Sequence, residues 1–153
     1  SPLKQLTATI GKNQRIMLVH NTFISQKEIK EIHSFFEDPW FCLCPQSNKT
    51  ITSTMPPAED IRALTNKILI GTDSSASNPN ISVWAEIVAL KKAYPAIPLE
   101  EILSWATFNG ATFYDWEELG SIEPGKRPGL VWLENFSDPA DSHLCNVRPC
   151  RVC

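Results

Sequence analysis

Three short apolar runs, separated by segments with helical periodicity, most constrain how this 153-residue chain can fold. The runs cover residues 15–20, 40–44 and 67–70. Nearly continuous apolar runs of this length are typical of parallel strands that are covered on both faces. The resulting order of strand, helix, strand, helix and strand predicts an α/β fold built on a parallel sheet.

Helix signals occupy the segments between the runs. Ser25 and Glu28 have the spacing of a capping box, and Pro39 is expected to end the helix that they begin. A second helix is expected to open at residues 56–57, where two prolines stand together. The polar stretch 46–55 before it is predicted to be a long loop.

The second half of the chain continues with helices and then changes character. Two helices are predicted at residues 82–94 and 99–109, and Pro98 and Gly110 mark the two ends of the second one. A proline- and glycine-rich turn then leads into a strand at residues 130–133. This strand lies outside the alternating series.

Charge and composition exclude several classes of function. The fourteen basic residues are scattered and the net charge is −3, so we expect no nucleic-acid partner. No apolar run approaches the roughly 20 residues of a membrane-spanning helix, and the first residues lack the layout of a secretory signal. Five cysteines, three of them within the last nine positions, form a poor framework for disulfides. We therefore expect a cytoplasmic protein with free thiols and no membrane partner.

Polar side chains stand where each predicted strand ends. His20 closes the first strand, Ser47 and Asn48 follow the second, and Asp73 with Ser74 closes the third. In parallel α/β folds the reactive groups gather at the carboxyl ends of the strands. The sequence therefore predicts that these residues share one site.

Four motifs, taken in this order, resemble the metal-dependent amidohydrolases, and within them the branch of guanine deaminase and the triazine hydrolases. The motifs are residues 18–22 (LVHNT), 44–48 (CPQSN), 71–78 (GTDSSASN) and 109–111 (NGA) with 120–126 (GSIEPGK). The resemblance implies the last three β/α units of a (β/α)8 barrel of the TIM type and a short β-segment of an accessory sandwich. It places the partial barrel at residues 1–119 and the sandwich segment at residues 120–153.

The resemblance implies a hydrolase that acts on a C–N bond of a small nitrogen heterocycle. Its cofactor would be one divalent metal ion, with zinc as the expected ion, and metal-bound hydroxide would be the nucleophile. Asp73 would be a metal ligand that also accepts a proton from the bound water, and His20 would hydrogen-bond the hydroxide or the oxyanion. Four further residues would line the substrate mouth: Ser47, Asn48, Ser77 and Asn78.

The chain departs from the family pattern in its metal ligands. The family binds its metal through a His-x-His pair and a further histidine, and this chain has neither. Because catalytic zinc needs about three protein ligands and an open position, we expect no metal and no catalysis in this chain alone. We expect a piece of a longer enzyme, or a natural half whose exposed sheet edges pair with another copy or with a missing N-terminal half.

Two non-enzymatic alternatives remain open from the residues. The tail carries His143, Cys145, Cys150 and Cys153, which could hold a structural zinc ion in an interaction module. Alternatively, the tryptophans could form a docking surface, although their helix and strand spacing is more typical of a core. These tryptophans are Trp40, Trp84, Trp105, Trp116 and Trp132.

Overall fold

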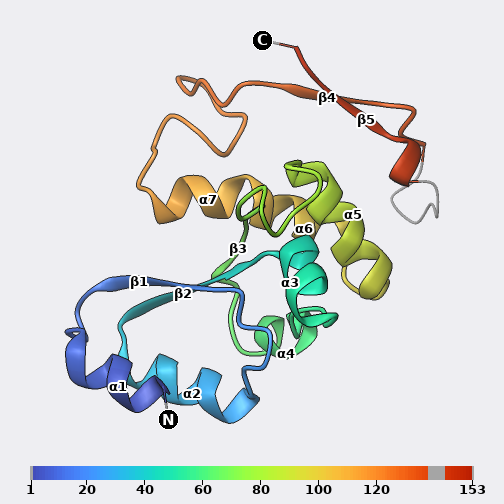
Figure 1. Cartoon of the computed structure of the whole chain (residues 1–153). Coiled ribbons are helices and arrows are strands. Elements are labelled where there is room, and N and C mark those ends of the chain that lie inside the picture. Colours follow the sequence, from blue (N-terminus) through green and yellow to red (C-terminus); the bar gives the residue numbers. More distant parts are fainter. Residues whose placement is uncertain (1, 138–143, 153) are drawn as a thin grey trace.

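A three-stranded parallel sheet is the central feature of the computed structural model, which describes residues 2–137 and 144–152 (Figure 1). Its strands are β1 (Arg15–Val19), β2 (Asp38–Leu43) and β3 (Ile68–Ile70), in the order β1-β2-β3. Both strand pairs are parallel, so the three carboxyl ends lie at the same edge. The predicted parallel α/β sheet is confirmed.

Helices pack around this sheet and enclose the main core. The described residues form α1 (Pro2–Thr9), α2 (Gln26–Phe35), α3 (Pro45–Thr52), α4 (Ala58–Arg62), α5 (Val83–Ala93), α6 (Leu99–Ala106) and α7 (Phe108–Phe113). Side chains of the central strand β2, such as Phe41 and Leu43, are fully buried in the core with Ile29, Ile61 and Ile102 from the helices. None of the helices in the described part of the chain is long and apolar enough to cross a membrane.

The capping box predicted at the start of α2 is confirmed. The Ser25 hydroxyl accepts from the Glu28 N–H at 3.3 Å, and the Glu28 carboxylate accepts from the Ser25 N–H at 3.0 Å. This reciprocal pair satisfies two backbone donors that have no partner inside the helix. The helix ends at Phe35, before Pro39, and Pro39 itself lies inside β2.

The prediction of a long loop at residues 46–55 is wrong, because residues 45–52 form α3. Pro45 takes the first helical position, where its missing N–H costs nothing. The polar residues Ser47 and Asn48 are buried in this helix and bonded to other segments. Tertiary hydrogen bonds therefore stabilise a helix that the polar sequence does not suggest.

The single helix predicted at residues 99–109 is also wrong, because the chain breaks at Thr107 into α6 and α7. Gly110 lies inside α7 and does not end a helix. The break lets the buried Asn109 side chain donate to the carbonyl of Asn66 at 2.9 Å and to that of Ile68 at 2.7 Å. These bonds fasten α7 to the start of β3.

The C-terminal part forms a second, antiparallel sheet of β4 (Val131–Glu134) and β5 (Arg148–Arg151). In Figure 1 this pair lies on the far side of α7 from the parallel sheet. Pro149 stands in β5 opposite Leu133, which is tolerated because β5 is an edge strand. The β-segment expected after the turn at 124–129 is thus present.

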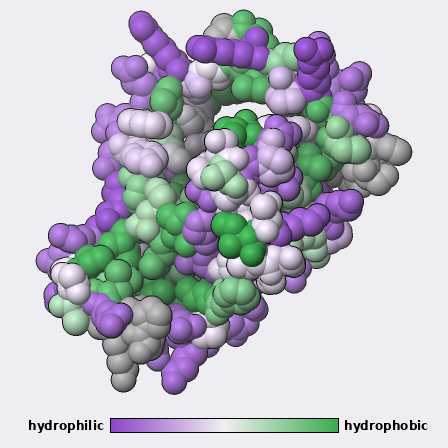
Figure 2. Space-filling view, in the orientation of Figure 1, coloured by the Kyte–Doolittle hydropathy of each residue, from purple (hydrophilic) through white to green (hydrophobic). Residues whose placement is uncertain are grey.

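The edge of β1 is apolar where it meets solvent. Figure 2 shows hydrophobic residues gathered along β1 and the adjoining side of α1 and α2. Val19, at the end of β1, is 48% exposed. An apolar open edge of this kind is a surface on which another strand can pair.

His33 on α2 is expected to make the stability of the fold depend on pH. Its Nε2 is buried without a hydrogen-bond partner in the described part of the chain, and its ring centroid lies 5.8 Å from that of Phe41. Burial and then the charge of Lys67 lower the pKa of His33 from its ordinary value of 6.5. The unfolded chain therefore binds this proton more readily, so the free energy of unfolding should fall as the pH drops below 6.5.

The variant His33→Leu tests this expectation. It fills the same space without a titrating group, so the unfolding free energy should change less between about pH 8 and 5 than in the unmodified chain. Urea unfolding at several pH values in this window measures the difference. If the unfolding free energy fell equally in both proteins at acid pH, a group other than His33 would be responsible.

Candidate active site

Residues that follow β1 and β3 meet at the carboxyl edge of the parallel sheet. His20 continues β1, and its backbone N–H donates to the Cys42 carbonyl of β2 at 2.9 Å. Asp73 follows β3, and its Oδ2 lies 3.9 Å from His20 Nε2. The structure therefore brings the two predicted central residues together from segments far apart in the sequence.

Both residues adopt a left-handed backbone, with φ of 69° at His20 and 56° at Asp73. This conformation is uncommon outside glycine, although histidine, asparagine and aspartate adopt it more often than most residues. It turns the chain sharply where the strand stops. Strained conformations of this kind cluster at functional sites, and here they occur at both ends of one contact.

The Asp73 carboxylate is held by two hydroxyl groups. Its Oδ2 accepts from Ser77 Oγ at 2.6 Å and from Ser47 Oγ at 2.7 Å. These bonds, from Ser77 first and then Ser47, hold the pKa of Asp73 below its ordinary value because they stabilise the charged form. Asp73 is therefore a carboxylate at neutral pH, poised to bind a cation or accept a proton.

Asn48 fixes the orientation and the tautomer of His20. Its Nδ2 donates to the His20 carbonyl at 3.1 Å, so its Oδ1 faces His20 Nδ1 at 2.9 Å as an acceptor. Nδ1 accordingly carries a proton, and in the neutral ring Nε2 is then the acceptor on the side of Asp73. The 3.9 Å gap between His20 Nε2 and Asp73 Oδ2 is too wide for a hydrogen bond. Both side chains can therefore bind the same third group.

The four residues predicted to line the substrate mouth are buried in this chain. Ser47 and Asn48 are 0% and 1% exposed, and Ser77 and Asn78 are also buried. Their side chains bond to Asp73, to His20 and, for Asn78, to the Thr72 carbonyl at 2.7 Å. Direct contact of these four residues with substrate stays a prediction.

One residue of this network, Glu86 on α5, was not predicted from the sequence. It is fully buried, and its carboxylate accepts from the backbone N–H of Gln46 at 2.8 Å and from Asn78 Nδ2 at 2.6 Å. Burial raises the pKa of Glu86, against the effect of the two donors. A signal was present in the sequence, because Glu86 stands beside Ile87 and four residues before Leu90 on the buried side of the helix.

The described residues do not fit a complete catalytic zinc site. They contain no group of three or more His, Cys, Asp or Glu side chains that could hold a metal ion. Catalytic zinc needs about three protein ligands, and here Asp73 offers one carboxylate with a single histidine beside it. Asp73 suits the role of one ligand in a site whose other ligands come from elsewhere.

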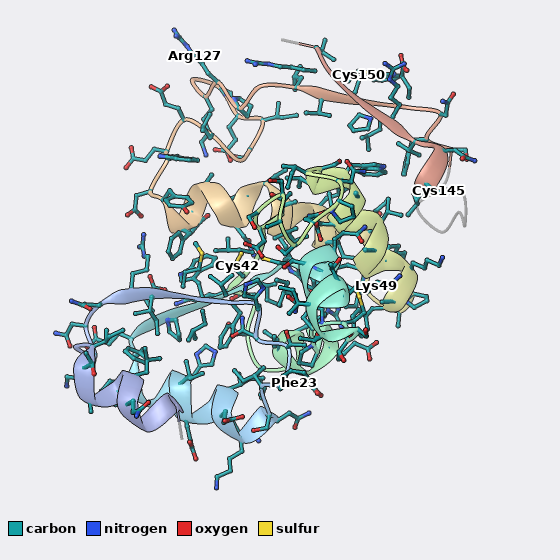
Figure 3. The ribbon with its side chains drawn as sticks, viewed as in Figure 1. Phe23, Cys42, Lys49, Arg127, Cys145 and Cys150 are labelled. Carbon is teal, nitrogen blue, oxygen red and sulfur yellow. The ribbon has the colours of Figure 1, made fainter. Side chains whose placement is uncertain are left out.

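The structure tests only one of the two non-enzymatic alternatives. For the zinc module, His143 and Cys153 lie outside the described residues, so the two ligands that the structure describes, Cys145 and Cys150 (Figure 3), leave this alternative untested. Among the tryptophans, Trp40 and Trp105 are buried, so the five do not form one docking surface. Trp116 and Trp132 are exposed.

A comparison with known families matches residues 7–148 to the amidohydrolase family. The chain belongs to this family. Among curated relatives, the 5-methylthioadenosine/S-adenosylhomocysteine deaminase of Dictyoglomus turgidum is 30% identical over 134 residues, which are 83% of this chain and 31% of the relative. The chain thus spans about a third of the length of the curated relatives it matches.

Two solved structures of deaminases are similar to this chain in both sequence and fold. An adenosine deaminase from Xanthomonas campestris with bound zinc has 32% identity and a TM-score of 0.71, over 85% of this chain and 31% of that one. The Helicobacter pylori aminofutalosine deaminase in complex with methylthio-coformycin has 26% identity and a TM-score of 0.72, over 90% and 36%.

A more distant structure shares the fold. Atrazine chlorohydrolase from Arthrobacter aurescens, complexed with zinc, has 19% identity and a TM-score of 0.78, over 97% of this chain and 36% of that one. The resemblance to the amidohydrolases is confirmed by the family match, and the more similar relatives named above are deaminases. These relatives imply that the described sheet and helices are a fragment of the α/β barrel of this superfamily.

Proposed function

We propose that the protein to which this chain contributes deaminates a nucleoside-like nitrogen heterocycle by hydrolysis of a C–N bond. The observation that carries the proposal is the convergence of His20 and Asp73, each fixed by partly buried hydrogen bonds at a strand end. Deaminases of nucleosides and related compounds among the relatives support this class of substrate.

In this proposal Asp73 has two roles. It supplies one carboxylate ligand to a divalent cation, with zinc as the expected ion, whose other ligands lie outside the described residues. Such a cation, when bound, makes water a nucleophile at neutral pH. Asp73 also accepts the proton of the attacking water and passes it to the leaving nitrogen, which departs as ammonia.

His20 orients the attacking water. Asn48 Oδ1 accepts from His20 Nδ1 and so holds Nε2 on the side of Asp73, where it hydrogen-bonds the attacking water or the oxyanion. Ser47 and Ser77 keep Asp73 charged and aimed at the same point. The substrate is also proposed to contact four side chains of this site: Ser47, Asn48, Ser77 and Asn78.

The chain is proposed to supply residues 1–119 as the last three β/α units of the barrel and residues 120–153 as the sandwich segment. The other strands pair with the open edges of β1 and β3 and come from a longer chain or from a second one. Taken alone, the chain is inactive because it offers one of about three ligands. We place the enzyme in the cytoplasm.

A chimeric enzyme tests the proposed function. The segment of the Xanthomonas campestris adenosine deaminase that matches this chain is replaced by the chain, and ammonia release is measured with a panel of purine nucleosides. We expect the chimera to release ammonia and the isolated chain to release none. A folded, zinc-loaded chimera that deaminates nothing would contradict the proposed activity, and deamination by the isolated chain would contradict the incomplete site.

A further inference from the structure

The N-terminus of α3 is capped from another helix. The residue before it, Cys44, makes no side-chain cap, which leaves the first backbone N–H groups of α3 in need of acceptors. The N–H of Gln46 donates to Glu86 Oε2 of α5 at 2.8 Å. A carboxylate at this position also interacts favourably with the positive end of the helix dipole. Glu86 therefore does for α3 what a local cap does for other helices.

The second carboxylate oxygen of Glu86 holds the loop after β3. Its Oε1 accepts from Asn78 Nδ2 at 2.6 Å, and the same nitrogen donates to the Thr72 carbonyl at 2.7 Å. Asn78 Oδ1 in turn accepts from the N–H of Asn80 at 3.0 Å. The Asn78 amide is thus committed at both ends, and it cannot be turned over without loss of these bonds.

The two arms of Glu86 reach the two halves of the candidate site. Gln46 directly precedes Ser47 and Asn48, which bond to Asp73 and His20, and Asn78 directly follows Ser77, which bonds to Asp73. We infer that Glu86 is a positioning residue, whose buried carboxylate ties the start of α3 to the loop after β3 and so fixes His20 against Asp73. This inference rests on the proposed function, because Glu86 gains a role only through those two residues.

The charge of Glu86 is as important as its shape. In Glu86→Gln the amide presents one oxygen and one N–H₂ group to two donors, the Gln46 N–H and Asn78 Nδ2. One donor must then face another donor whichever way the new amide is turned. Since Asn78 is held by its own partners, one arm of the connection is lost at nearly constant volume.

Nuclear magnetic resonance of the 153-residue chain tests the inference without metal or substrate. In Glu86→Gln we expect whichever donor loses its acceptor, the Gln46 N–H or the Asn78 side-chain amide, to exchange roughly tenfold faster, as expected for the loss of a hydrogen bond to a charged acceptor. If the Gln46 bond is the one lost, the ring ¹⁵N shifts of His20 should lose the signature of a single Nδ1–H tautomer. Ser82→Ala is the matched control, because it removes the cap of α5 itself, four residues before Glu86, and touches neither site loop. In Ser82→Ala the His20 signals should stay unchanged, even where its melting temperature falls as far as that of Glu86→Gln.

A second variant separates the two hydrogen bonds of Glu86, to Gln46 and to Asn78. It also tests the positioning role of Glu86 if Glu86→Gln does not fold. Asn78→Ala should shift the Ser77 and Thr72 amide signals and leave the His20 ring signals in place, because the Gln46 arm remains. In folded Glu86→Gln, unchanged signals at both Gln46 and Asn78 would overturn the inference, and so would a lost Gln46 bond with unchanged His20 signals. Unchanged Ser77 signals in Asn78→Ala would also overturn it. Failure of the chimera to deaminate would overturn the proposed function and leave these signals as expected, so the two failures are distinguishable.

Discussion

Asp73→Asn in the chimeric deaminase is expected to lower the rate of ammonia release by roughly 10²–10⁴-fold, the range for loss of an acid–base group. The amide that replaces the carboxylate cannot accept the proton of the attacking water and is a poor ligand for a divalent cation. It can still accept the hydroxyl bonds from Ser47 and Ser77, so the fold should be retained. Steady-state kinetics measure the rate, and the melting temperature checks the fold.

The matched control for this variant is Asp115→Asn. The Asp115 carboxylate is exposed, pairs with Arg15 at 2.8 Å and takes no part in the candidate site. Exposed ion pairs contribute little, so this change should leave the rate near that of the unmodified chimera. If Asp73→Asn kept most of its activity, or if both variants lost it equally, the assigned role of Asp73 would be wrong.

Phe41→Ala is expected to lower the free energy of unfolding by about 3–5 kcal/mol, through lost transfer energy and the cavity left behind. Phe41 lies in the central strand β2 and is 0% exposed, with the ring of His33 against it. A loss of this size is a large share of the roughly 5–15 kcal/mol that stabilises a typical domain. Denaturant unfolding of the 153-residue chain, followed by circular dichroism, measures it.

Phe23→Ala removes the same ring from a loop where it is 77% exposed (Figure 3). The unfolding free energy should then change by no more than about 0.5 kcal/mol. Similar losses for Phe23→Ala and Phe41→Ala would show that the core is not where the structure places it.

The parallel sheet and the meeting of His20 with Asp73 were predictable because both depend on short-range patterns. Apolar runs mark the strands, and the carboxyl ends of parallel strands necessarily share one edge. The capping box of Ser25 and Glu28 is a local signal of the same kind.

The helix α3 was not predictable from such patterns. Its buried residues Ser47 and Asn48 are polar, and their partners Asp73 and His20 lie in other parts of the chain. The same is true of the break at Thr107, since the Asn109 side chain bonds to carbonyls before and within β3. Where hydrogen bonds across the fold decide the local structure, propensity alone gives the wrong answer.

Glu86 illustrates a different limit of sequence reasoning. A glutamate on the buried side of a helix is unusual, but the pattern does not say which donors it meets. Its partners are a backbone N–H at the start of α3 and the Asn78 amide, and only the folded chain shows that they belong to one network.

The metal content of the purified 153-residue chain, measured beside that of the chimera, tests most directly whether this chain supplies one ligand of a shared site. We expect a value near zero for the isolated chain and about one zinc per molecule for the chimera. About one zinc in the isolated chain would rule out a shared site, because the chain would then hold a metal site of its own.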